Sequence, residues 1–350
     1  MRLLIGTYTE VHDHVEGHAE GVLVADYDEH AASLDSWRTV AARSPSWLAL
    51  SPTTSRVYAV VEAGGSDRGE VAMFSREGDS LELAQVEPSG GTAPAHLALD
   101  PAGTFLAVAN YADGVVSVFA VQADGRLGPA TDVVQHTGSS VHPIRQVSPH
   151  PHHVCFDVVT GELLVTDLGL DAIVRYSIDD AGQLTRQGRT DLPPGSGPRH
   201  TLAHPDGQHL LVISELENTV TVLTRRGTGF EVVSTVSTLP EDATGPSFAS
   251  ALVITRTGDV VYAANRGHDS IAVFAWDAGS ATLALEQCCS SRGTTPRDIA
   301  LSPDETLLLA ANQDSDSVVT FSRDAQGLLT FRESATIPTP VCLVFDTGRS

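Results

Sequence analysis

Short apolar strands recur along this chain as copies of one unit, and this repeat limits the folds that the chain can adopt. The clearest copy covers residues 195–218. A turn at 198–200 leads into an apolar strand, and a hairpin at 204–207 leads into a second strand, 210–214, which ends at Glu215. Glycine in the hairpin supplies the positive φ angle that so tight a turn requires. Each unit is therefore a turn, a strand, a hairpin and a returning strand.

Seven copies of the unit fill most of the chain, beginning near residues 45, 94, 151, 198, 250, 296 and 340. Their period of roughly 43 to 58 residues predicts a β-propeller with about four strands in each blade. The last copy stops after half a unit, and residues 1–7 and 21–27 are spare strands that can complete it. We expect an all-β, seven-bladed β-propeller, a single domain over residues 1–350, whose N-terminal strands join the last blade and close the ring.

The composition limits the classes of partner. Asp and Glu number 44 against 21 Lys and Arg, so the net charge is −23, and nucleic acid and anionic membranes are poor partners for such a surface. No apolar run approaches the roughly 18 residues of a membrane-spanning helix. The four cysteines are irregularly spaced and predict no disulfide framework. We expect a cytoplasmic protein that is a monomer or a homodimer.

Two positions in the repeat hold polar or charged residues at the same end of the strands. The first position follows the blade proline, and the second ends the returning strand. The first holds His152, Arg199 and Arg297, and the second holds Glu62, Asn110, Asp167, Glu215, Asn265 or Arg266, and Asn312 or Gln313. Because one strand starts where its hairpin partner returns, both positions face one mouth of the central channel. Any one of these residues also fits a structural role, in binding the amides of a turn.

Cations are concentrated in this predicted ring. Arg199, Arg266 and Arg297 lie there with a histidine cluster and Glu215, in a chain with few basic residues. Such a gathering implies an anionic ligand, since the arginine fork suits carboxylate or phosphate. Either Glu215 or His152 is then placed to act as a general base on water or as a proton donor. The longest connection between blades, residues 122–150, ends beside this histidine cluster, and loops of such length are often functional.

Three further histidines, His12, His14 and His18, lie close together near the N-terminus. They suggest a metal site, but no cysteine or paired carboxylate completes a ligand set at compact spacing. We expect this segment to be a surface loop between two strands. We also expect the protein to use no metal and no cofactor.

The motifs at these positions resemble the lactonase family of seven-bladed β-propellers, which includes bacterial 6-phosphogluconolactonases and a fungal carboxymuconate lactonising enzyme. The resemblance covers nearly the whole chain. Its motifs lie at residues 6–9, 109–111, 114–118, 150–152, 167–171, 197–200, 215–216, 265–267, 295–298 and 311–313.

The resemblance also implies a set of site residues. In the lactonising enzyme the proposed catalytic set is a histidine, two arginines and a glutamate. By motif these resemble His152, Arg199, Arg266 and Glu215. An extra residue within 157–161 leaves open whether His152 or His153 faces the channel. The residues expected to bind substrate are His150, His200, Arg297, Asn110, Asp167 and Gln313.

Three functions are compatible with these features. The first, implied by the resemblance, is a metal-independent lactonase that hydrolyses 6-phospho-glucono-1,5-lactone in the pentose phosphate pathway, with arginines holding the phosphate and polarising the ring ester. The second is a cycloisomerase that closes 3-carboxymuconate to its lactone. Both take a small anionic lactone or polycarboxylate as substrate, and the sequence does not separate them. The third is a non-catalytic propeller used for binding or as a scaffold, which would tolerate the loss of Arg199 or Glu215.

Overall fold

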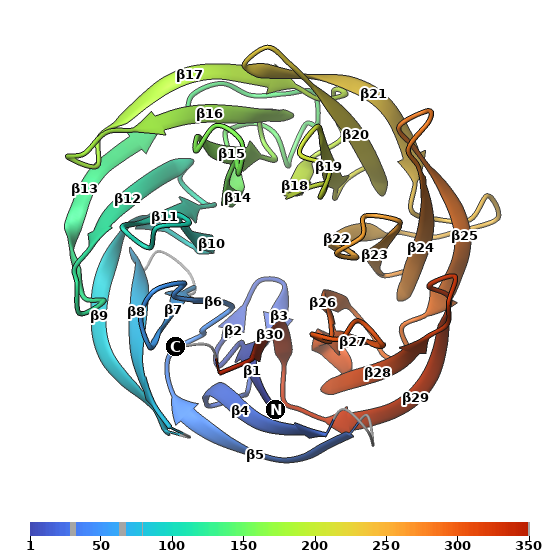
Figure 1. Ribbon diagram of the computed structural model, residues 1–350, viewed down its shortest axis with the longest axis horizontal. Helices are drawn as coiled ribbons and strands as arrows, with labels where there is room; N and C mark the ends of the chain where they lie inside the picture. Colours follow the sequence, from blue (N-terminus) through green and yellow to red (C-terminus); the bar gives the residue numbers. More distant parts are fainter. Residues whose placement is uncertain (29–32, 63–67, 79, 349–350) are drawn as a thin grey trace.

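The computed structural model describes residues 1–28, 33–62, 68–78 and 80–348 and confirms the seven-bladed β-propeller. Seven four-stranded antiparallel sheets are arranged around a central channel, with the first strand of each blade nearest the axis and the fourth at the rim (Figure 1). The first strands are β6 (Trp47–Leu50), β10 (Pro94–Leu99), β14 (Pro151–Phe156), β18 (Pro198–Ala203), β22 (Phe248–Ile254), β26 (Pro296–Leu301) and β30 (Pro340–Asp346). The second strands are β7 (Arg56–Val61), β11 (Phe105–Asn110), β15 (Leu163–Asp167), β19 (His209–Ser214), β23 (Val260–Arg266), β27 (Leu307–Asn312) and β1 (Arg2–Thr7).

The outer half of each blade has the same order. The third strands are β8 (Arg68–Glu77), β12 (Val115–Val121), β16 (Ala172–Ile178), β20 (Thr219–Arg226), β24 (Ser270–Asp277), β28 (Ser317–Arg323) and β4 (Gly21–Asp28). The fourth strands are β9 (Ser80–Thr92), β13 (Leu127–Gln135), β17 (Leu184–Asp191), β21 (Gly229–Ser237), β25 (Thr282–Ser290), β29 (Leu329–Thr336) and β5 (Ser33–Ala41). A small hairpin of β2 (Val11–His12) and β3 (Val15–Glu16) and the 3-10 turn η1 (Gln313–Ser315) complete the described elements.

The burial pattern explains why these sequences form these strands. Second strands are buried on both faces because each packs between two neighbouring blades, so β27 reads as an almost continuous apolar run and is buried at every residue. Fourth strands lie at the rim, and β29 is exposed over most of its length. The core is therefore a series of apolar clusters between adjacent blades, such as the cluster that contains Ile213 of β19 and Val261 of β23.

The N-terminal strands close the ring, as the half unit at the C-terminus predicted. Strand β1 pairs with β30 on one side and with β4 on the other, so the last blade has the order β30-β1-β4-β5. Leu3 and Ile5 pack against Leu309 of the preceding blade, and Leu4 packs against Val57 of the following blade. The fourth strand of this blade, β5, is polar in sequence and was not among the predicted strands.

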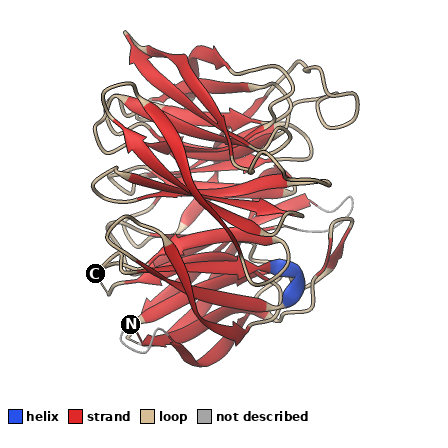
Figure 2. Cartoon of the chain, turned by 90° about the vertical axis from the view of Figure 1, so that its right-hand side faces the viewer, coloured by secondary structure: helices blue, strands red, loops and turns tan. Residues whose placement is uncertain are grey.

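The two ends of the channel differ in the loops that surround them. We call one end the proline mouth. There each first strand begins, in most blades at a proline, and each second strand ends. The pairing of Pro198 with Ser214 shows this arrangement in one blade. At the other end, the hairpin mouth, tight hairpins join the first and second strands, and Gly207 in one of them has a φ angle of 70°. Figure 2 shows η1 on one side of the ring and both chain termini on the other.

The structure bears on two expectations from the composition. The four cysteines Cys155, Cys288, Cys289 and Cys342 are free thiols, which agrees with the absence of a predicted disulfide framework. In the part of the chain that the structure describes, no helix has the length and apolar character needed to cross a membrane.

Candidate functional site

Glu215 lies at the centre of a cluster of arginines at the proline mouth. It follows β19 directly, and its carboxylate contacts Arg266 at 2.7 Å, Arg145 at 2.6 Å and Arg199 Nε at 3.4 Å. The contact with Arg199 is an ion pair without a well-aligned hydrogen bond, because Nε of Arg199 has no hydrogen-bond partner among the described residues. Three guanidinium groups from different parts of the chain are thus held by one buried carboxylate.

The charges of this cluster depend on one another. Burial opposes the ionisation of Glu215, but Arg266, Arg145 and Arg199 together hold the pKa of its carboxyl well below the usual range. Burial and the neighbouring Arg266 and Arg297 lower the pKa of Arg199 to about 9. At neutral pH, Glu215 is therefore an anion and Arg199 is still a cation, so the positive charge stays fixed in a water-poor site.

A second polar group lies beside the first and is built around Tyr8. The Tyr8 hydroxyl donates to Glu62 at 2.7 Å and accepts from Arg297 at 2.7 Å, and Ser46 donates to the same oxygen of Glu62 at 2.7 Å. Burial is the main cause that raises the pKa of Tyr8, so the phenol stays protonated. Arg297 is thereby held toward the channel by a hydroxyl and lies over the Tyr8 ring at 5.1 Å.

The charged groups around Glu215, with Arg199, Arg266 and Arg297, are called the charged ring below. His152 faces this charged ring as a neutral imidazole. It begins the channel side of β14, is 7% exposed, and has a buried Nδ1 without a partner among the described residues. Burial, together with Arg199, lowers the pKa of His152 well below its usual range. His153 lies instead against His96, with ring centroids 4.0 Å apart. The structure therefore places His152 in the charged ring and His153 below it.

Five of the residues expected from the sequence come together at the proline mouth: His152, Arg199, Glu215, Arg266 and Arg297. His150 lies at the edge of this group, stacked on Tyr111 with ring centroids 4.6 Å apart. Tyr111 in turn accepts a hydrogen bond from Arg145 at 3.1 Å, so His150 is linked to the arginine cluster through that ring.

The other expected substrate-binding residues lie elsewhere or are fully engaged. Asn110 is completely buried and bonds Ser117 of its own blade and Ser89 in β9 of the preceding blade. Asp167 is also completely buried and accepts from the backbone of His150 and from His136.

His200 and Gln313 occupy two different surroundings. His200 lies below the charged ring, where Nη1 of Arg199 is 3.0 Å from its Nε2. Gln313 lies in η1, where its amide donates to Asp314 at 2.8 Å and its carbonyl oxygen is buried without a partner among the described residues. Asn110, Asp167 and His200 are therefore left out of the site that we propose below.

Several residues of the site were not among the sequence-based candidates. Tyr8 and Glu62 form the second polar group, and Arg145 and Tyr111 extend the first. Arg145 lies in the long connection before β14, whose length was a sign of function. Glu62 occupied a repeat position that was predicted to face this mouth of the channel, which was a usable signal, whereas Tyr8 lay in a family-like motif without a predicted role.

The hairpin of β2 and β3 lies over the proline mouth and reaches toward the channel axis (Figure 1). Its His14 is 3.3 Å from the Tyr8 hydroxyl, and partial desolvation together with the charge of Arg297 lowers the pKa of His14. A cavity of about 530 Å³ opens here between the hairpin and the Gln313–Ser315 turn. Most residues of the segment are exposed, as expected of a surface loop, and His14 connects the segment to Tyr8 of the site.

The histidines of this hairpin do not gather around a common point. His12 and His14 have ring centroids 5.7 Å apart, and His18 pairs with Asp316 instead. Within the described residues, the group with three metal-ligand atoms close enough to share an ion is elsewhere, at His204, Asp206 and His209. The proline mouth is thus built from arginines, carboxylates, phenols and imidazoles.

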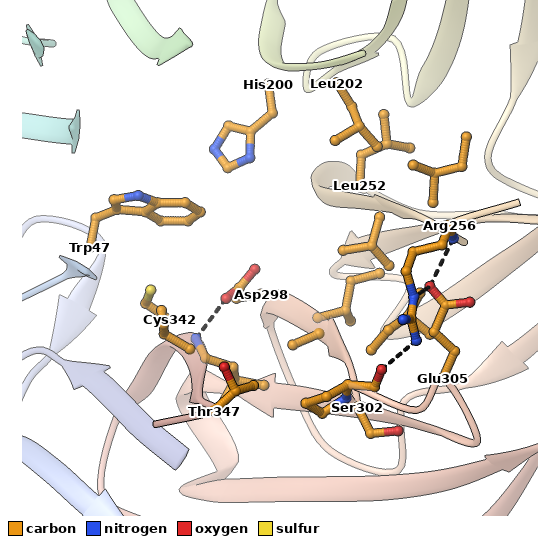
Figure 3. A pocket seen from close by; sticks show the side chains of 18 residues that line it. Trp47, His200, Leu202, Leu252, Arg256, Asp298, Ser302, Glu305, Cys342 and Thr347 are labelled. Atoms are coloured by element: carbon orange, nitrogen blue, oxygen red, sulfur yellow. Dashed lines mark hydrogen bonds and ion pairs between the residues drawn. The ribbon is translucent and has the colours of Figure 1, made fainter. Parts of the chain in front are cut away.

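A separate cavity of about 610 Å³ extends from the hairpin mouth into the channel. Figure 3 shows Trp47, His200 and Asp298 at one end of this cavity and Arg256 and Glu305 at the other. Its walls are mostly aliphatic, and it contains none of the clustered arginines around Glu215. The chemistry of the polar groups therefore favours the proline mouth as the active site, although the cavity at the hairpin mouth has a larger volume.

The fold and the site together define a class: a seven-bladed propeller with an arginine-rich mouth that suits a small anion. The model of the family described as "Lactonase, 7-bladed beta-propeller" matches residues 2–345 of this chain. The chain belongs to the lactonase family of seven-bladed β-propellers.

Similar proteins carry related names. The chain is 35% identical to a 6-phosphogluconolactonase of Bacillus subtilis, with 97% of each chain covered. A Pseudomonas aeruginosa structure described as a periplasmic gluconolactonase superposes with a TM-score of 0.91 at 32% identity, covering 98% of each chain. A structure described as a putative 6-phosphogluconolactonase, from Bacteroides fragilis, gives a TM-score of 0.88 at 30% identity, covering 99% of this chain and 97% of the other.

Proposed function

We propose that this protein is a lactone hydrolase that opens 6-phospho-glucono-1,5-lactone to 6-phosphogluconate at the proline mouth. The observation that carries the proposal is the cluster in which a neutral imidazole, His152, lies beside three arginines held by Glu215. Lactone hydrolysis needs a base for water and fixed positive charge for the oxyanion, and this cluster supplies both. The names of the similar proteins support the same reaction class and substrate.

The roles follow from the protonation states. His152 accepts a proton from the attacking water as the oxygen–carbonyl carbon bond forms, because its imidazole is neutral at neutral pH. The guanidinium of Arg199 stabilises the negative charge that develops on the carbonyl oxygen, which is worth about 3 kcal/mol for each well-placed donor. When the ester bond to the ring oxygen breaks, His152 returns the proton to that oxygen.

Glu215 is assigned a positioning role. Both oxygens of its carboxylate already bind guanidinium groups, whereas Nδ1 of His152 has no hydrogen-bond partner among the described residues. The sequence left open whether Glu215 or His152 acts as the base, and these contacts favour His152. Glu215 fixes the arginines in the geometry that the transition state requires.

The phosphate of the substrate has cations available at the rim of the site. Arg145 has 34% of its side chain exposed and Arg266 has 16%, whereas Arg199 lies deeper, with 4% exposed. All 21 basic residues of the chain are arginines, so every cation of the site offers the planar fork that suits phosphate or carboxylate. We assign the phosphate to Arg145 and Arg266, and the lactone carbonyl to the deeper Arg199.

The test is the initial rate of lactone opening above the spontaneous rate. Freshly generated 6-phospho-glucono-1,5-lactone is compared with unphosphorylated glucono-1,5-lactone, and product is followed by a coupled dehydrogenase for each acid. The proposal predicts acceleration of both, with kcat/KM higher for the phosphorylated lactone. Acceleration of neither lactone would contradict it, and 3-carboxymuconate is then the substrate that tests the cycloisomerase.

The cellular location and the oligomeric state of the protein stay predictions. A cytoplasmic location fits a phosphorylated substrate, although the similar Pseudomonas aeruginosa structure is described as that of a periplasmic enzyme. Fractionation of cells that express the protein from its own locus measures the location. Sedimentation of the purified chain decides between the expected monomer and homodimer.

A further inference from the structure

A cluster of three possible metal ligands lies at the hairpin mouth, away from the proposed active site. His204 and Asp206 belong to the hairpin between β18 and β19, and His209 begins β19. Nδ1 of His204 lies 3.0 Å from Oδ2 of Asp206, and Nδ1 of His209 lies 2.7 Å from the same oxygen. The three ligand atoms are within 4.8 Å of one another. We propose that these residues bind one divalent transition-metal ion.

The turn itself does not require this arrangement. Oδ1 of Asp206 already accepts the backbone amides of Gln208 at 2.8 Å and His209 at 3.1 Å, which is the usual way for an aspartate to fix a tight turn. Oδ2 is left to face the two imidazoles. One carboxylate oxygen between two ring nitrogens is therefore an additional feature of this hairpin, beyond the bonds that shape it.

The far side of the His204 ring is fixed in the manner of a metal ligand. Nε2 of His204 is 3.0 Å from the carbonyl oxygen of Gly258 in the next blade, so Nε2 carries the proton and Nδ1 keeps its lone pair. The backbone amide of Asp206 donates to that same Nδ1 at 3.2 Å, so the lone pair is present there, and an ion that binds Nδ1 replaces this long hydrogen bond. The unprotonated Nδ1 and the carboxylate oxygen 3.0 Å away repel each other, and a bound cation, whether a metal ion or a proton, removes this repulsion.

The next blade holds His204 in place by close packing. A Cβ atom added to Gly258 would lie 2.7 Å from the His204 ring, so only glycine lets the two blades approach this closely. Trp276, also in the next blade, has its ring 4.5 Å from that of His204 and 5.2 Å from that of His209. The two imidazoles are thus held between blades by an indole and a carbonyl group, which limits their movement.

The donor set indicates which ions fit. Two imidazole nitrogens with one carboxylate oxygen suit Zn²⁺, Ni²⁺ or Cu²⁺, whereas Mg²⁺ and Ca²⁺ prefer sets of oxygen ligands. Three protein ligands leave a coordination position open for water. The histidines that the sequence suggested as a metal site, at 12–18, lie at the opposite mouth, and the sequence marked the residues of the present cluster only as part of a turn.

The experiment uses the full chain without a histidine tag, treated with chelator and then titrated with Zn²⁺ by calorimetry. The proposal predicts that the wild-type chain binds one equivalent of Zn²⁺ and that His209→Gln binds none over the same range of Zn²⁺ concentration. His209→Gln removes a partly exposed ligand and leaves the contact between His204 and Gly258 in place. His14→Gln is the matched control, since it removes an imidazole at the other mouth. This variant should keep the full equivalent.

Two further readouts separate binding from a folding defect. Zn²⁺ should raise the Tm of the wild type by a few degrees and leave that of His209→Gln unchanged, because an ion that binds the folded state stabilises it by mass action. Cu²⁺ should quench tryptophan fluorescence in the wild type and not in Trp276→Phe, although that variant still binds the ion.

Three outcomes would overturn the proposal. The wild type could take up no Zn²⁺. His209→Gln, folded by circular dichroism, could take up as much Zn²⁺ as the wild type. Uptake could instead be lost in His14→Gln. The last result would place the ion at the proline mouth.

Discussion

Glu215 keeps its charge inside the protein because three arginines surround it. An isolated carboxylate in such a place would become neutral, yet the ion pairs with Arg266, Arg145 and Arg199 hold its pKa well below the usual range. The same carboxylate prevents the guanidinium groups from repelling one another. The site therefore contains fixed positive charge before any substrate enters, which is the condition for strong stabilisation of an oxyanion.

Replacing Glu215 with glutamine tests this positioning role. Glu215→Gln removes the charge that holds the arginines, so we expect kcat to fall by about a hundredfold, as small misplacements of catalytic groups typically cause. KM should not rise, since the cations for the substrate remain. The free energy of unfolding should also fall by about 3 kcal/mol, because buried cations lose their partner. Steady-state kinetics and urea unfolding measure the two effects, and an unchanged kcat would contradict the role.

The pH dependence of the reaction tests the assignment of His152. Burial and Arg199 lower the pKa of His152 well below its usual range, so the base form is present throughout the neutral range. We expect kcat/KM to change by no more than about twofold between pH 6 and 8. His152→Gln should lower kcat by about 10²-fold or more. An acid limb with an apparent pKa near that of a free histidine would contradict this assignment.

Residues of the charged ring could be predicted from the sequence only where they occupied one of the two polar positions of the repeat unit. Arg199, Glu215 and Arg266 each lie at such a position, and the structure brings them together. Tyr8 and Arg145 lie outside the repeating strands, in the closing segment and in a long connection. The repeat register does not determine how such segments fold back over a channel, so the sequence offered no geometric reason to include them.

At the scale of elements, the first strands of neighbouring blades are joined by polar contacts inside the channel. Asp298 in β26 accepts the backbone amide of Leu343 in β30 at 2.7 Å, which connects the sixth copy of the repeat to the closing blade. Burial raises the pKa of Asp298 to about 7. The folded protein therefore binds this proton more tightly than the unfolded chain does.

This shift predicts a dependence of stability on pH. The proton on Asp298 stabilises the folded state fully below the unfolded pKa of about 4, and this contribution is lost as the pH rises through about 7. Asp298→Asn should thus be more stable than the wild type at pH 8, by roughly 4 kcal/mol at most, and this advantage should shrink to roughly 1.5 kcal/mol at pH 5. The difference in unfolding free energy between variant and wild type is measured by urea at both pH values, which cancels the opposite effect of the buried histidines. An equal difference at the two values would contradict the shift.

The whole molecule depends on the closing blade, in which strands from both ends of the chain pair. Strand β1 is a central strand of this blade and carries two ladders of hydrogen bonds. The half unit at residue 340 predicted this closure, since an open ring would leave strand edges unpaired. Strand β5 could not be predicted in the same way. Its sequence at the rim is polar and lacks the apolar run that marks the inner strands.

A proline in β1 tests the contribution of closure. Ile5→Pro removes a backbone donor within a central strand and a fully buried side chain, so we expect the free energy of unfolding to fall by about 3 kcal/mol or more. Gln187→Pro is the control, because Gln187 is the extra residue of a bulge in the rim strand β17 and is exposed. Urea unfolding of both variants measures the effect. Equal losses of unfolding free energy in the two variants would show that closure of the ring contributes no more to stability than a rim strand does.

Catalysis of lactone opening by the charged ring at the proline mouth is tested most directly by a comparison of three proteins. The quantity measured is the initial rate on 6-phospho-glucono-1,5-lactone, above background, for the wild type, Arg199→Ala and Arg256→Ala. Arg256 lies at the hairpin mouth, so its replacement removes the same charge without touching the ring.

We predict that Arg199→Ala, folded by circular dichroism, loses about 10²-fold or more in kcat/KM, while Arg256→Ala keeps the rate of the wild type. Equal rates for all three proteins, or an equal loss in both variants, would contradict a catalytic role for the charged ring.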